Sequence, residues 1–198
     1  GRLLGVAIAD ASGHGLPAAL LARDVITGLR MGMDERSKVP RIVERLNRVI
    51  HRAALSSKFI SLFYGEFGPG GTLGYCNAGH NPPLLINPTQ NQDVQSLTGT
   101  GMPLGVTKDA VWSEDELTLA QGEVLILFTD GVTEAQNLAG EFFGEPQGRV
   151  SIMDCIASSL DGGCSAQSIL DELLKHIHQF IGSAPRSDDI TLMVIRRE

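Results

Sequence analysis

Hydrophobic residues in this chain gather into short runs and periodic stretches that polar turns separate. Leu3 to Ala9 is a nearly continuous apolar run, as expected of a buried strand, and the run stops at Asp10. After a glycine-rich turn, the residues from Leu16 to about Met33 are rich in Leu, Ala and Met and predict a helix. Because this helix is apolar almost all round, we expect it to be buried.

A second helix is indicated by apolar residues that recur every three or four positions after Ser37, which can act as its N-cap. The apolar stripe consists of Val39, Ile42, Val43, Leu46, Val49, Ile50 and Ala53. On the opposite face, basic residues form a line: Arg41, Arg45, Arg48 and Arg52. Two interpretations of this arginine line stay open, a solvated helix face and a docking surface for an acidic partner.

Strands are expected mostly in adjacent pairs. The segments are Phe59–Phe67, Thr72–Ala78, Leu84–Asn87, Asp115–Leu119, Glu123–Thr129 and Ile190–Arg196. The first two flank a glycine-rich turn and predict a hairpin, and Asp115–Leu119 is expected to pair with Glu123–Thr129 across the turn at 120–122. Two late helices are predicted near Val150–Leu160 and Ser165–Ile181. This order favours an α+β fold with antiparallel sheets covered by helices.

Composition places the chain among ordinary globular proteins. Its 198 residues are 42% hydrophobic and 20% charged, which suits one domain spanning residues 1–198. The net charge of −7 disfavours general nucleic-acid binding, because neutralising phosphates requires clustered Lys and Arg. No apolar run approaches the roughly 18 residues of a membrane span, and no signal-peptide pattern opens the chain, so we expect a cytoplasmic protein.

Acidic residues stand at three predicted strand ends: Asp10, Asp130, and the pair Asp188 and Asp189. Any one of them alone is explained by the frequent use of Asp in turns. As a set they suggest a metal site, because carboxylates are the ligands of hard divalent ions such as Mg²⁺ or Mn²⁺. Two such ions could activate a bridging water for attack on a phosphorus atom, which needs no protein nucleophile.

The aspartates at the strand ends belong to a series of five sequence motifs that follow one another along the chain. They are Asp10-Ala-Ser-Gly-His-Gly, Asn77-Ala-Gly-His-Asn-Pro-Pro-Leu, Pro103-Leu-Gly, Phe128-Thr-Asp-Gly-Val-Thr-Glu-Ala and Asp188-Asp-Ile-Thr-Leu. The chain thereby resembles the SpoIIE-like, RsbU-type branch of the PPM metal-dependent serine/threonine protein phosphatases. The resemblance covers residues 3 to about 196. It implies a four-layer αββα sandwich of two antiparallel sheets flanked by helix pairs.

The resemblance also implies roles for individual residues. Asp10 and the Ala11 carbonyl would contact a pair of Mn²⁺ or Mg²⁺ ions, Asp130 and Asp188 would bind the second ion, and Gly131 and Asp189 would lie near the site. The nucleophile would be a metal-bound water. The family's substrates are phosphoserine or phosphothreonine proteins, often anti-sigma-factor antagonists in partner-switching pathways.

His14 has two open interpretations: it could protonate the leaving alkoxide or help to bind phosphate, and it could equally brace its turn. One departure from the family concerns a further metal-ligand motif, Gly-Asp-x-Tyr/Phe-Asp, on the strand before Leu3, which this sequence does not contain. We expect that the first strands precede the fragment, so the domain is N-terminally incomplete. The alternative is a natural variant with a weakened site. Two metal ions are expected in the complete site, and without the upstream aspartate strand we expect them to be absent.

Three functional hypotheses follow. The first is a metal-dependent phosphatase acting on a phosphorylated regulatory protein. The second is a non-catalytic PPM-fold module that binds a phosphoprotein and uses the arginine line. The third is a regulatory role, in which a fused sensor or receiver domain controls dimerisation or the order of the active site.

Overall fold

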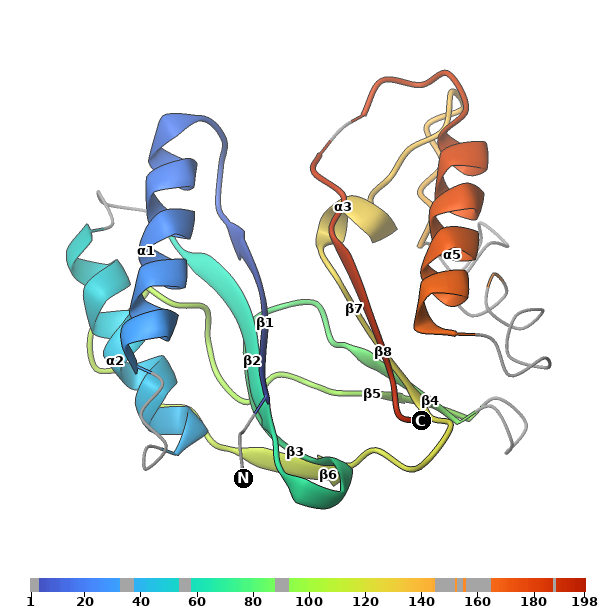
Figure 1. Cartoon of the computed structure of the whole chain (residues 1–198). Coiled ribbons are helices and arrows are strands. Elements are labelled where there is room, and N and C mark those ends of the chain that lie inside the picture. Colours follow the sequence, from blue (N-terminus) through green and yellow to red (C-terminus); the bar gives the residue numbers. More distant parts are fainter. Residues whose placement is uncertain are drawn as a thin grey trace. The chain divides into compact units, whose positions relative to one another are not determined.

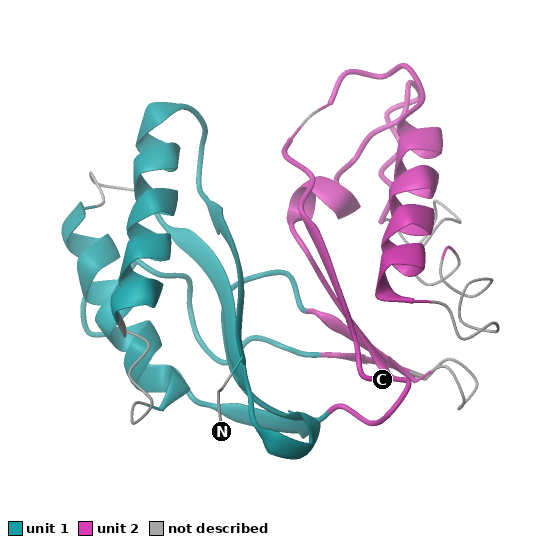
Figure 2. Ribbon diagram, in the orientation of Figure 1, with its two compact units in different colours: residues 1–82, 97–118 teal, residues 83–96, 119–198 magenta. Residues whose placement is uncertain are grey.

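A computed structural model of the chain describes residues 4–32, 38–53, 58–87, 93–144, 152, 155, 165–186 and 188–198. These residues fold into two compact units, which Figure 2 shows in teal and magenta. Unit 1 comprises Gly1–Pro82 and Leu97–Thr118, and unit 2 comprises Pro83–Ser96 and Leu119–Glu198. Each unit therefore joins segments that are far apart in the sequence.

Unit 1 is an antiparallel sheet with two helices. Its strands are β1 (Leu4–Ala11), β2 (Ile60–Phe67), β3 (Thr72–Ala78) and β6 (Asp115–Thr118), in the order β1-β2-β3-β6. The helices are α1 (Leu16–Gly32) and α2 (Val39–Ala53), and a short 3₁₀ turn, η1 (Pro69–Gly71), joins β2 to β3 (Figure 1). The predicted hairpin of β2 and β3 is confirmed, with Phe67 opposite Leu73.

The core of unit 1 lies between the helices and one face of the sheet. It contains Leu21, Val25 and Leu29 of α1, Val39, Ile42, Val43, Leu46 and Ile50 of α2, and Ile60, Leu62, Tyr64, Cys76 and Ala78 of the strands. The predicted stripe of α2 is therefore largely confirmed. It is wrong at Val49, which is 46% exposed, and at Ala53, which is also exposed, while Asn47 is fully buried. Ser37, its expected N-cap, lies outside the described residues.

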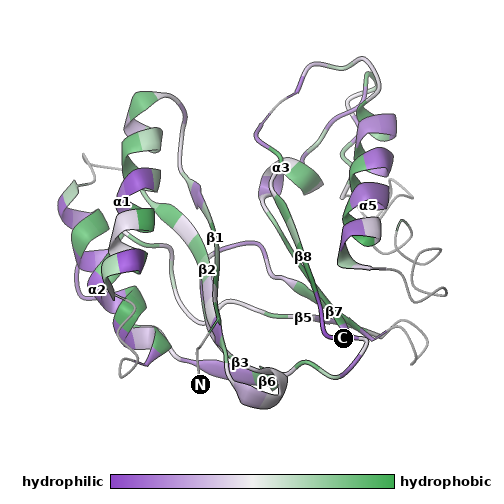
Figure 3. Ribbon diagram, viewed as in Figure 1, coloured by the Kyte–Doolittle hydropathy of each residue, from purple (hydrophilic) through white to green (hydrophobic). Residues whose placement is uncertain are grey.

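Helix α1 departs from the prediction that it would be buried on all sides. Leu16, Ile26 and Met31 are 71%, 53% and 84% exposed. The helix packs along a single stripe with four-residue spacing, so its remaining apolar side chains face away from the core of unit 1. Figure 3 shows green segments along α1, and the exposed apolar residues Leu16, Ile26 and Met31 lie outside the core cluster of unit 1.

Unit 2 has a second antiparallel sheet, in the order β5-β4-β7-β8. The strands are β4 (Leu84–Asn87), β5 (Asp93–Ser96), β7 (Val124–Phe128) and β8 (Leu192–Arg196), and the helices are α3 (Asp130–Thr133) and α5 (Ala166–Ile181). Strand β5 was not predicted. Ser165 caps α5, because its Oγ accepts a hydrogen bond of 3.1 Å from Ser168 N. The helix predicted at Val150–Leu160 lies outside the described residues, apart from Ile152 and Cys155.

The core of unit 2 forms where α5 packs on its sheet. Ile169, Leu173, Ile177 and Ile181 of the helix meet Val124, Ile126 and Phe128 of β7, together with Ile86, Val132 and Phe143. All five residues of β7 are buried. Among the described residues, no helix has both the length and the apolar character needed to cross a bilayer.

The predicted pairing of Asp115–Leu119 with Glu123–Thr129 is wrong. Strand β6 pairs with β3 in unit 1, and β7 lies between β4 and β8 in unit 2. The physical reason is burial: β6 has an exposed edge with Asp115 and Glu116 in solvent, whereas β7 needs neighbours on both sides. The α+β class with two antiparallel sheets is nevertheless confirmed, and one domain over residues 1–198 stays a prediction.

Candidate functional site

Asp10 lies at the end of β1, in a segment that the neighbouring strand holds closely. It stands opposite Ser61, and Ala11 stands opposite Ile60. The pairing continues past the strand, because Ser12 N donates a hydrogen bond of 2.9 Å to Phe59 O and Ser12 Oγ accepts one of 2.9 Å from Phe59 N. The carbonyl of Ala11 and the partly exposed carboxylate of Asp10 are thus presented from a fixed backbone.

The turn after Ser12 requires glycine. Gly13 and Gly15 have φ values of +84° and +77°, a conformation that other residues adopt only with strain. His14 stands between them, exposed, and makes no hydrogen bond or ion pair with another described residue. Within the part of the chain that the structure describes, nothing shows His14 bracing the turn, so its role stays a prediction.

A buried polar network supports the sheet beside Asp10. Ser61 Oγ lies 2.8 Å from Nδ1 of His80, which is only 5% exposed. The fully buried Asn77 accepts a hydrogen bond of 2.8 Å from His80 N and donates one of 3.2 Å to Leu97 O. Asn77 and His80 therefore shape a tight connection, and through Ser61 they reach the residue opposite Asp10.

Thr129 ties the end of β7 to the start of β8 in unit 2. Its N donates to Thr191 O at 3.1 Å, and its Oγ1 accepts from Thr191 N at 3.1 Å and donates to Asp189 O at 3.2 Å. Asp130 follows as the first residue of α3. The Asp130 turn and the Asp188–Asp189 segment are thereby fastened together.

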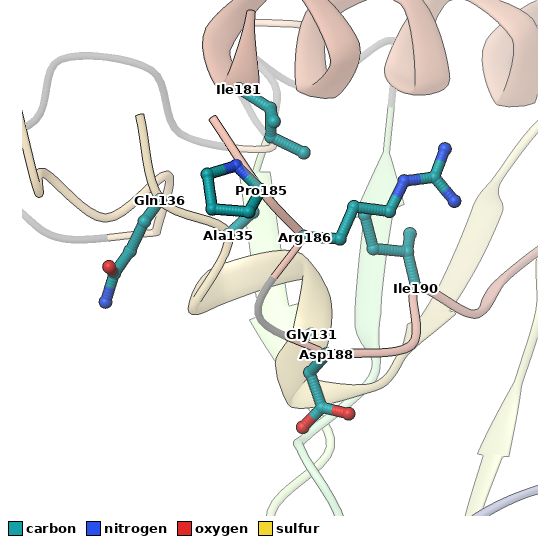
Figure 4. A pocket seen from close by; sticks show the side chains of 8 residues that line it. All are labelled: Gly131, Ala135, Gln136, Ile181, Pro185, Arg186, Asp188 and Ile190. Atoms are coloured by element: carbon teal, nitrogen blue, oxygen red, sulfur yellow. The ribbon is translucent and has the colours of Figure 1, made fainter. Parts of the chain in front are cut away.

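Gly131 completes this junction by permitting close approach. A β-carbon at this position would overlap Asp189 O, lie 2.9 Å from Asp189 C and lie 3.5 Å from the Asp188 β-carbon. Figure 4 shows Gly131 and Asp188 side by side, lining a hollow with Arg186 and Ile190. The structure thus brings together three predicted site residues of unit 2, namely Gly131, Asp188 and Asp189, with Asp130 adjoining in the chain.

One carboxylate oxygen of Asp130 is buried without a hydrogen-bond donor among the described residues. Its Oδ1 is shielded from solvent and has no hydrogen-bond donor among the described residues. A carboxylate oxygen can only accept, so burying it unpaired is costly unless a cation satisfies it. This observation fits a divalent ion with oxygen ligands at Asp130.

The complete predicted ligand set is divided between the units. Asp10 and Ala11 belong to unit 1, and Asp130 and Asp188 belong to unit 2. Among the described residues, no group of three or more His, Cys, Asp or Glu side chains is gathered in a way that could hold a metal ion. The three-aspartate cluster therefore stays a prediction.

The arginine line on α2 is exposed, as both of its interpretations require. Arg41, Arg45, Arg48 and Arg52 all face solvent. Arg41 pairs with Glu44 at 3.1 Å on the same helix. Such an exposed pair contributes little free energy of folding.

Comparison with known proteins decides the family. The family model described as Stage II sporulation protein E (SpoIIE) matches residues 1–198. The chain belongs to the SpoIIE family. A curated relative, the phosphoserine phosphatase RsbU of Bacillus subtilis, is 30% identical over 200 residues, which cover 98% of this chain and 56% of RsbU. This chain therefore spans about half the length of that relative.

Solved structures share the fold. The SiaA-PP2C domain of Pseudomonas aeruginosa matches with a TM-score of 0.78 and 21% identity, over 99% of this SpoIIE-family chain and 75% of that one. A structure of RsbX in complex with magnesium matches with a TM-score of 0.67 and 17% identity, over 98% of this chain and 80% of that one. The resemblance to the SpoIIE-like branch of the PPM phosphatases is confirmed.

Proposed function

We propose that this chain is the phosphatase domain of a metal-dependent enzyme that hydrolyses phosphoserine or phosphothreonine on a regulatory protein, such as an anti-sigma-factor antagonist. The observation that carries the proposal is the buried Oδ1 of Asp130, which has no donor among the described residues and lies in a junction fastened to Asp188 and Asp189. Family membership and a phosphoserine phosphatase as relative support it.

In this proposal Asp10, the Ala11 carbonyl, Asp130 and Asp188 are ligands of Mn²⁺ or Mg²⁺. When bound, such ions neutralise phosphate charge and activate water as a nucleophile. Gly131 allows the loops of Asp130 and Asp188 to approach closely at Asp189, and the hydrogen bond from Thr129 Oγ1 to Asp189 O fixes their spacing. His14, exposed after Asp10, gives a proton to the serine or threonine oxygen as the phosphorus–oxygen bond breaks.

The test is phosphopeptide hydrolysis in the presence of Mn²⁺, Mg²⁺ or a chelator. Wild type is expected to turn over only with a divalent ion, and Asp10→Asn and Asp130→Asn are each expected to lose at least about 100-fold in kcat/KM, since each removes a metal ligand. Asp109→Asn, which neutralises an exposed carboxylate outside the proposed site, is the matched control. Undiminished turnover in both site variants would refute the assignment.

A second candidate function is a binding module without catalysis. The exposed arginine line on α2, in a chain of net charge −7, is the observation that favours it. Such a module binds its phosphoprotein without turnover, and replacing Arg45 and Arg48 by Ala weakens that binding. Because RsbU is longer than this chain, a fused sensor or receiver domain and a homodimer are part of the proposal for either function.

A further inference from the structure

Lys58 lies against the turn that follows Asp10. A β-carbon added at Gly13 would overlap the Lys58 ammonium nitrogen and lie 3.5 Å from its Cε. The ammonium therefore occupies the space over Gly13 that only glycine leaves open. Gly15, which has the same kind of backbone conformation, has nothing within 4 Å of its own added β-carbon.

The backbone on the C-terminal side of Lys58 is firmly held. Phe59 exchanges two hydrogen bonds of 2.9 Å with Ser12, and Ile60 exchanges two with Leu104, at 3.0 Å and 2.8 Å. The Lys58 carbonyl packs on Gly105, whose added β-carbon would be 3.2 Å from it. Although Lys58 is partly exposed, its side chain therefore starts from a fixed point.

The Lys58 ammonium makes no hydrogen bond or ion pair with another described residue. A lysine that only braced a turn would be expected to donate to a carbonyl or a carboxylate, since it has three donors. Its position beside the turn that carries Asp10 instead suits an anion brought to Asp10. A phosphoserine carries a charge of about −1.5 to −2 and three acceptor oxygens.

We propose that Lys58 binds the phosphoryl group of the phosphoprotein substrate, donating hydrogen bonds to its non-bridging oxygens beside Asp10. This rests on the proposed phosphatase function and adds a residue that sequence motifs do not mark. Lysine serves here as a point charge: it neutralises the phosphate without the bidentate hydrogen-bonding geometry that arginine imposes.

The experiment compares Lys58→Met, which keeps the length of the side chain, with Lys58→Arg, which keeps the charge. Lys58→Met is expected to lower kcat/KM for a phosphopeptide about 10- to 100-fold, mainly through KM, and to weaken competitive inhibition by inorganic phosphate to a similar extent. Lys58→Arg is expected to recover most of both. Lys108→Met, which removes an exposed lysine of the same unit, should change neither more than about twofold.

Gly13→Ala supplies an independent probe, with Gly15→Ala as its control. Both substitutions strain a turn of positive φ, but only the Gly13 methyl displaces the ammonium. Gly13→Ala should therefore raise KM more than Gly15→Ala does. It should add little to KM in a protein that already carries Lys58→Met, because the two changes remove one interaction.

A binding measurement separates this proposal from the phosphatase assignment. In the Asp130→Asn protein, fluorescence anisotropy reports affinity for the phosphopeptide and for its unphosphorylated form. Lys58→Met should weaken only the former. If it leaves phosphopeptide affinity, KM and phosphate inhibition unchanged, Lys58 has no such role even though metal-dependent turnover stands. If wild type shows no turnover, the binding comparison still decides whether Lys58 contacts the phosphoryl group. Lys58→Gln replaces Lys58→Met should that variant fail to fold.

Discussion

Replacing Gly131 by Ala tests whether the Asp130 junction must be placed accurately. Gly131 has no need of a positive φ, so the substitution causes no backbone strain of its own. Its methyl group, however, would overlap Asp189 O and stand 2.9 Å from Asp189 C. Ordinary van der Waals contact begins at 3.4 Å, so the contact with Asp189 C alone requires the Asp188–Asp189 segment to retreat by 0.5 Å, and the closer Asp189 O requires more.

That displacement sets the expected magnitudes. Overpacking a tight site costs about 1 to 3 kcal/mol of unfolding free energy. Catalytic groups tolerate errors of only about 0.5 Å, and a displacement of about 1 Å can cost roughly 100-fold in rate. We therefore expect Gly131→Ala to lower kcat by about 10- to 100-fold and to raise the divalent-ion concentration needed for half-maximal activity.

Gly68→Ala is the matched control. Gly68 also has an ordinary backbone, with φ −90°, but its added β-carbon would meet only Thr72 O at 3.8 Å. The two variants are compared by urea unfolding and by phosphopeptide turnover over a titration of Mn²⁺. If Gly131→Ala keeps wild-type turnover and metal dependence, the spacing between Asp130 and Asp188 does not limit the chemistry.

Two predictions concern stability. Asn47→Ala is expected to cost roughly 2 to 4 kcal/mol in urea unfolding, because the buried amide donates to Thr107 O and Lys108 O and accepts from Gly105 N; a loss below about 1 kcal/mol would contradict this. Burial raises the pKa of the Cys76 thiol to about 12, so above pH 9 the unfolded thiol loses its proton while the folded one keeps it. Stability should fall as pH rises from 9 towards 12, by up to about 1.4 kcal/mol per pH unit. Urea unfolding of Cys76→Ala should show a shallower decline over that interval, and an identical decline would contradict the reasoning.

Periodicity predicted most elements because their burial is one-sided. The stripe of α2 from Val39 to Ile50 has helical spacing, and the continuous apolar run of β7 predicts a strand with a neighbouring strand on each side. Single positions failed where a polar group has a specific partner. Asn47 is buried and Val49 is exposed because the Asn47 amide satisfies the backbone at 105–108, which no pattern in the sequence marks.

Pairing partners were harder to predict than strands. The short link at 120–122 suggested a hairpin, but the buried β7 and the exposed β6 belong to different sheets. For the site, motifs predicted Asp130 and Asp188, whereas Lys58 was missed because its contact with Gly13 is long-range. The only available signal was the positive charge that precedes the strand opposite Asp10.

The motifs contain structural residues as well as proposed ligands. Asn77 and His80 hold a buried connection, Thr129 fastens two strands, and Gly131 allows two loops to touch. A protein could keep all of these contacts and its fold while lacking a metal, because none of them requires an ion. The resemblance therefore supports the fold more strongly than the activity. Asp130, whose buried oxygen has no donor among the described residues, is the motif residue that distinguishes the phosphatase activity from the fold alone. If Asp130→Asn leaves the fold intact and abolishes both turnover and the thermal stabilisation by Mn²⁺, the carboxylate serves the ion.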